Sequence, residues 1–90
     1  MPFYTYVVSY RGATYVDQVR SSNIKGHGPG FVGAMLAKPE AHFSPKMINE
    51  TVGKAYYTEW TPVPNRINLW RASFDLEGSE FLIHVIQTQP

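Results

Sequence analysis

The chain of 90 residues contains no cysteine. Disulfides, thiol catalysis and cysteine-based metal sites are therefore excluded, and the fold must be stabilised by its core alone. No apolar run approaches the roughly 20 residues of a membrane span, and the first residues lack the positively charged start of a secretion signal. We therefore expect a cytoplasmic protein that does not enter a membrane.

A strong charge of either sign is also missing. Eight Lys and Arg residues against seven Asp and Glu residues leave a net charge of +1. Dedicated nucleic-acid-binding modules are usually far more basic, so nucleic acid is a possible partner but not the favoured one. The content of 43% hydrophobic residues is typical of a folded protein. Because domains usually hold roughly 100 to 150 residues, we expect residues 1–90 to form one domain.

In the carboxy-terminal residues 66–88, folding the chain back about one turn signal, Glu77-Gly78, places three facing apolar pairs on one face. This pattern predicts a hairpin with a two-residue loop. Burial fixes its register, because a shift by one residue would set Phe74 against Glu80 and turn half of the apolar side chains to the other face. The expected facing pairs are Leu76 with Ser79, Phe74 with Phe81, Ala72 with Ile83, and Trp70 with Val85.

A similar hairpin is expected at the amino terminus, where residues 3–10 and 13–20 flank Arg11-Gly12. We expect the Tyr-rich face to be buried, which brings Asp17 near aromatic rings and requires a partner for its carboxylate. In both hairpins a type I turn with a glycine bulge is an alternative to a type I′ turn. The expected pairs on the Tyr-rich face are Tyr10 with Ala13, Val8 with Tyr15, Tyr6 with Asp17, and Tyr4 with Val19.

The middle of the chain predicts two short helices. Residues 21–30, SSNIKGHGPG, have the composition of a loop, and residues 31–38 predict a helix that Pro39 ends. The second helix begins after Ser44 as N-cap and ends at Gly53 as C′ residue. The expected buried positions are Phe31, Val32, Met35 and Leu36 in the first helix and Met47, Ile48 and Val52 in the second.

Residues 55–61, AYYTEWT, have the aromatic and β-branched content of a third strand, and residues 62–65 turn the chain into the last hairpin. The order of elements is then strand, strand, helix, helix, strand, strand, strand. The simplest architecture for this order is an α+β fold. We expect a twisted antiparallel sheet of four or five strands with two short helices on one face.

The glycine-rich stretch 25–30 is the most motif-like part of the chain. Glycines let backbone N–H groups approach an anion, and the start of a helix offers unpaired donors. A weak anion-binding or nucleic-acid-binding site is therefore one hypothesis, although a plain flexible connection is the favoured interpretation. The GxGxxG spelling over residues 28–33 is discounted, because no strand of a parallel βαβ unit precedes it. The candidate residues are Arg20, Lys25, Gly26, His27, Gly28 and Gly30.

No constellation of catalytic or metal-binding residues is evident. The histidines at positions 27, 42 and 84 lack metal-ligand spacing, and the acidic residues at 75, 77 and 80 are interpreted as the solvated tip of a hairpin. We therefore expect neither a metal nor a cofactor and assign no catalytic residue. A small enzyme whose active site cannot be placed is the alternative.

The last strand is apolar on both faces, since Leu82 and Ile86 point away from the core formed by Phe81, Ile83 and Val85. Two short helices cannot cover both faces of the sheet, so the second face predicts a contact surface. The favoured function is a small non-enzymatic interaction or accessory protein that self-associates, most simply as a homodimer. A sheet that curls its first hairpin over this face is the alternative. The candidate association residues are Ile67, Leu69, Leu82, His84 and Ile86.

Overall fold

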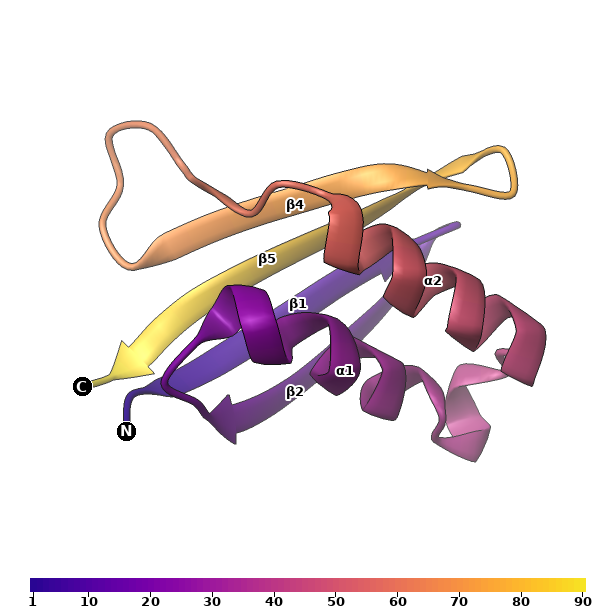
Figure 1. Ribbon diagram of the computed structural model, residues 1–90, viewed down its shortest axis with the longest axis horizontal. Helices are drawn as coiled ribbons and strands as arrows, with labels where there is room; N and C mark the ends of the chain where they lie inside the picture. The colour runs from indigo at the N-terminus through magenta and orange to yellow at the C-terminus, as the bar shows by residue number, and fades with distance from the viewer.

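The computed structural model describes residues 1–90 and shows one antiparallel sheet of five strands with both helices on the same face (Figure 1). The predicted α+β class and the order ββααβββ are confirmed. Along the sheet the strand order is β2-β1-β5-β4-β3. The elements are β1 Phe3–Tyr10, β2 Ala13–Arg20, α1 Ile24–Leu36, the 3-10 helix η1 Pro39–Ala41, α2 Pro45–Tyr57, β3 Thr61–Pro62, β4 Leu69–Leu76 and β5 Ser79–Gln89.

Both long hairpins have the expected register. In β4–β5, Phe74 faces Phe81 and Trp70 faces Val85, and in β1–β2, Tyr6 faces Asp17. The two residues at each tip have positive φ: Arg11 (48°) with Gly12 (80°), and Glu77 (51°) with Gly78 (86°). Positive φ at both central positions identifies the type I′ turn, whose twist matches that of the flanking strands. The turn and the burial pattern thus specify the same pairing.

The expectation that the Tyr-rich face of the first hairpin is buried is confirmed. Tyr6 and Val8 are fully buried, and Tyr4 and Tyr10 are nearly so. Tyr6 packs edge-on against the rings of Phe31 and Trp60. Burial raises the pKa of Tyr6 to about 12, with a smaller contribution from Tyr4. The sheet side of the core is therefore aromatic where α1 crosses it.

The prediction that residues 21–30 form a loop is wrong. Helix α1 begins at Ile24 and passes through the glycines and Pro29, and it ends at Leu36, short of the expected residue 38. The Asn23 side chain caps it by accepting a hydrogen bond from the Gly26 N–H at 3.0 Å. Gly and Pro disfavour a helix interior, so tertiary packing must hold this first half of α1.

Two glycines of α1 show what that packing is. A Cβ atom at Gly28 would lie 2.8 Å from Trp60 Cη2 and 3.1 Å from the Tyr6 hydroxyl oxygen. A Cβ atom at Gly33 would lie 2.6 Å from Cγ2 of Val52 on α2. The glycines therefore serve the close approach of α1 to an aromatic pair and to its neighbouring helix rather than the freedom of a loop.

Helix α2 begins as predicted, with the Ser44 hydroxyl accepting a hydrogen bond from the Met47 N–H at 3.2 Å. The predicted end at Gly53 and the predicted strand from residue 55 are both wrong, because α2 continues to Tyr57 and only Thr61–Pro62 form β3. Thr51 and Ala55, one turn apart, are fully buried, so the buried face of the helix continues past Gly53.

Trp60 connects the end of α2 to the core. Its indole N–H donates to the Ala55 carbonyl oxygen at 2.9 Å, and its ring covers Gly28. One apolar cluster of 14 buried residues then joins the sheet to both helices. Neither α1 nor α2 combines the length and the apolar content that a helix needs to cross a membrane.

Candidate functional site

The face of the sheet opposite the helices carries no second layer of secondary structure (Figure 1). We call it the open face. Its side chains form rows across the strands, and apolar and hydroxyl-bearing residues dominate the middle of these rows. The three central rows, from β2 to β4, are Gln18, Thr5, Ile86, Leu69; Val16, Val7, His84, Arg71; and Thr14, Ser9, Leu82, Ser73.

The structure brings four of the five candidate association residues together on this face. Leu69 lies opposite Ile86, and His84 lies between Val7 and Arg71. Leu82 and Ile86 are half-buried by their neighbours in the sheet. The fifth residue, Ile67, precedes β4 in the loop and is 87% exposed. The first hairpin does not fold over these residues, because β1 and β2 continue the sheet beside β5.

Two apolar members of the open face come from the first hairpin and were not among the candidates. Val7 faces Val16 across β1 and β2, and Val16 is 61% exposed. The sequence signal was present, since the two valines form a cross-strand pair in the expected register. They gain significance only from the strand order, which places β1 directly beside β5. The apolar area therefore spans four strands instead of two.

Charges of both signs border the apolar rows. Arg71 lies 3.6 Å from a carboxylate oxygen of Glu80 on the neighbouring strand. Both side chains are exposed, so the ion pair contributes little to stability. His84 faces Arg71, as the register predicts. The open face is thus a mixed surface and not a purely cationic one.

The hairpin tip at residues 75–80 behaves as a turn. The Asp75 carboxylate accepts a hydrogen bond from the Gly78 N–H at 3.2 Å, and the Arg11 guanidinium donates to the Glu77 carbonyl oxygen at 2.7 Å. The two hairpin tips therefore brace each other.

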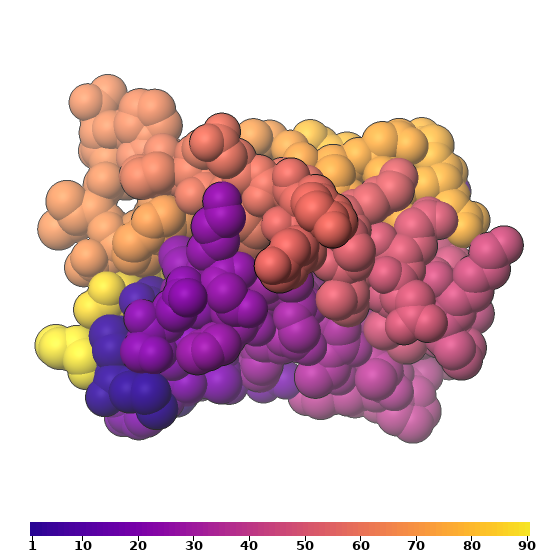
Figure 2. Space-filling view, in the orientation of Figure 1, coloured from indigo at the N-terminus to yellow at the C-terminus, as the bar shows by residue number.

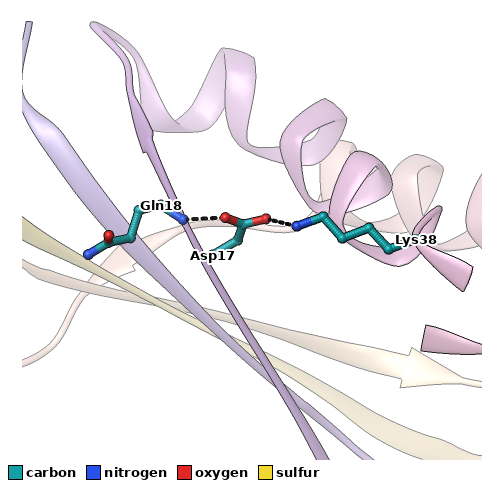
Figure 3. A network of polar contacts seen from close by, with 3 residues as sticks. All are labelled: Asp17, Gln18 and Lys38. Carbon is teal, nitrogen blue, oxygen red and sulfur yellow. Dashed lines mark hydrogen bonds and ion pairs between the residues drawn. The ribbon is translucent and has the colours of Figure 1, made fainter. Parts of the chain in front are cut away.

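The Asp17 carboxylate forms an ion pair with Lys38, the partner that its position near aromatic rings requires. One carboxylate oxygen accepts from Lys38 Nζ at 2.5 Å, and the other accepts from the backbone N–H of Gln18 at 2.9 Å (Figure 3). The hydrogen bond from Lys38, followed by that from Gln18, lowers the pKa of Asp17 below its ordinary value. The same contact raises the pKa of Lys38. This contact ties the outer strand β2 to the segment that follows α1.

A cavity of about 210 Å³ lies beside this ion pair. It lies between β2, the end of α1 and η1. Its walls combine apolar side chains with three charged groups at the rim. The lining residues are Thr14, Tyr15, Val16, Asp17, Met35, Lys38, Glu40 and Ala41.

The candidate anion-binding residues occupy several separate surroundings. The Arg20 guanidinium lies over the Phe3 ring and donates to the Met1 carbonyl oxygen at 3.0 Å. His27 Nδ1 lies 3.0 Å from the Ser21 hydroxyl oxygen. Lys25 is exposed in the first turn of α1.

Two of the three glycines of the same stretch have structural roles. Gly26 donates its N–H to Asn23, and Gly28 is buried under Trp60, while Gly30 is exposed with open space around it. The anion-binding hypothesis for this stretch stays a prediction.

Comparisons with protein-family models, with curated proteins and with solved structures found no match to this chain.

Proposed function

We propose that this chain is a small, non-enzymatic interaction protein that forms a homodimer through its open face. The observation that supports the proposal is the apolar centre of that face, formed by Val7, Leu82 and Ile86 with no helix above it. Apolar side chains grouped on a sheet surface are stabilised when a partner removes them from water. The proposed setting is the cytoplasm.

A second copy of the chain suits this face in size. The molecule measures 34 × 24 × 23 Å, and Figures 1 and 2 view it down its shortest axis. The product of the two longest dimensions, roughly 800 Å², is an upper bound on the area of the open face, so a contact of about the standard area per partner would use nearly all of it.

A second copy also suits the face in charge. Arg71 carries a positive charge at one border, while Glu80 and Asp75 carry negative charges next to it. A two-fold axis through the centre of the face can place the arginine of one copy near the carboxylates of the other. The dimer interface would then contain paired charges of both signs and no unbalanced charge.

Substitution of a central residue by a charged one tests the proposal. We expect Leu82→Glu and Ile86→Glu to give folded monomers, because a carboxylate at the centre of the interface would lose its water without gaining a partner. Sedimentation velocity reports the mass of each variant, and far-ultraviolet circular dichroism reports its fold.

Asn49→Glu is the matched control, because Asn49 is exposed on α2 and the substitution adds the same charge away from the open face. We expect this variant to remain a dimer. A Leu82→Glu variant that sediments as the unmodified dimer would show that the open face is not the interface.

A further inference from the structure

The outer edge of the sheet at β2 offers backbone groups for a further strand. The residues that flank a two-residue hairpin loop exchange hydrogen bonds with each other, and the pattern alternates from there. Ala13, Tyr15, Asp17 and Val19 therefore direct their backbone groups towards β1. The N–H and C=O groups of the residues between them point out of the sheet, where no strand lies beyond β2 to pair with them. These residues are Thr14, Val16 and Gln18.

One of these outward donors is already occupied. The Gln18 N–H donates to the Asp17 carboxylate, and Lys38 holds that carboxylate from the other side (Figure 3). Natural sheets commonly protect their edges in this way against unwanted pairing. The unprotected length of β2 is therefore short and is centred on Tyr15, with Thr14 and Val16 on either side.

The cavity of about 210 Å³ adjoins this unprotected length. A residue of an added strand that faces Tyr15 would direct its side chain to the same side of the sheet as Tyr15, towards the helices. That direction leads to the space between Tyr15, Met35 and Ala41. Free backbone groups and a side-chain pocket thus occur together, as strand-addition sites require.

We propose that this edge binds an extended segment of a partner protein as a short added strand, with one Arg or Lys side chain of the segment inserted into the cavity. The residues before and after that basic residue exchange backbone hydrogen bonds with Thr14 and Val16. The apolar stem of the basic residue packs on Met35 and Tyr15, and its charged end lies at the rim.

The charges at the rim select a basic side chain. The cavity is lined by two carboxylates, those of Asp17 and Glu40, and by a single ammonium group, that of Lys38. Lys38 pairs with Asp17, and Glu40 has no ion-pair partner. A cation from the partner would balance the charge of Glu40.

A second copy of this chain does not meet the same requirements. Pairing of two β2 edges through Thr14 and Val16 alone would set Tyr15 of one copy opposite Tyr15 of the other. The Tyr15 ring is already held edge-on against Phe43 in its own core, 6.0 Å between ring centroids. It cannot fill the cavity of the neighbouring copy.

The test uses the full chain labelled with nitrogen-15 and the acetylated, amidated pentapeptide Thr-Val-Arg-Val-Thr. We expect saturable amide shifts at Thr14, Val16, Met35 and Glu40 as the peptide is added. The same peptide with a central Glu should leave these amides unchanged. A peptide methylated on both valine nitrogens should also fail to bind, because it lacks the donors that pair with β2.

Glu40→Gln should weaken binding of the Arg peptide by roughly two- to fivefold, the range for an exposed ion pair. Glu59→Gln is the control, because Glu59 is exposed and does not line the cavity. The proposal is overturned if no peptide gives saturable shifts at millimolar concentration, or if the Glu or methylated peptide binds as well as the parent. Shifts at Thr14 and Val16 that depend on protein concentration and persist in the Leu82→Glu variant, whose open face cannot dimerise, would assign the edge to a second copy and overturn it too.

Discussion

At the scale of single residues, three groups have a shifted pKa: Tyr6 in the core, and Asp17 and Lys38, which pair with each other at the outer strand. Tyr6 lies in the centre of the core with no exposed surface. Asp17 lies at the outer strand, where two hydrogen bonds replace burial as the cause of its altered pKa. Each group gives the stability of the fold a pH dependence of predictable sign.

The stability of the protein should fall between about pH 10 and pH 12. The pKa of Tyr6 is about 12 in the folded chain and about 10 when exposed, so the contribution is complete below pH 10 and is lost as the pH rises through 12. The shift corresponds to about 2–3 kcal/mol. In urea unfolding, Tyr6→Phe should lose less stability at alkaline pH than the unmodified chain does. Tyr57→Phe should lose as much stability as the unmodified chain, because Tyr57 is 87% exposed. Equal alkaline losses in both variants would contradict this.

The lowered pKa of Asp17 depends first on Lys38. Lys38→Gln should therefore raise the pKa of Asp17 towards its ordinary value, while the bond from the Gln18 N–H keeps part of the effect. In the unmodified chain the stabilising contribution is present above the ordinary pKa of Asp and is lost as the pH falls through the lower, folded value. Carboxyl carbon shifts followed by NMR report the titration. Lys46→Gln, an exposed control, should leave it unchanged, and an identical Asp17 titration in both variants would remove Lys38 as the cause.

At the scale of elements, the sequence predicted the register of both hairpins but only part of the helices. The register of β4–β5 follows from local information, because turn chemistry and apolar alternation agree on Phe74 facing Phe81. The helical conformation of the first half of α1 does not follow from local information. It depends on the packing of Gly28 against Trp60, which lies far along the chain. Likewise, AYY at residues 55–57 has the composition of a strand, and only the packing of Ala55 against the core makes it helical.

Two glycines of α1 should respond oppositely to alanine. Gly30→Ala should stabilise the protein by about 0.5–1 kcal/mol, because alanine is the better helix former and nothing lies within 4 Å of the added methyl group. Gly28→Ala should destabilise it by about 1–3 kcal/mol, because the methyl group would collide with Trp60. Urea unfolding measures both. A Gly28→Ala variant as stable as Gly30→Ala would show that the contact with Trp60 is not close.

At the scale of the whole molecule, strand order decides where contact surfaces lie. The sequence indicated an apolar second face on the last hairpin, and Leu69, Leu82, His84 and Ile86 lie on it. It did not indicate that Val7 and Val16 extend that face, since the pairing of β1 with β5 joins the two ends of the chain. The sequence also could not predict the contact between Lys38 and Asp17, because that contact depends on where α1 ends above the outer strand.

The mass of the unmodified chain in solution tests the homodimer most directly. Light scattering coupled to size-exclusion chromatography, run over a wide range of protein concentrations, reports that mass. We predict a value approaching twice the 10.2 kDa of one chain as the concentration rises. A constant mass of a single chain at the highest concentration would contradict self-association through the open face.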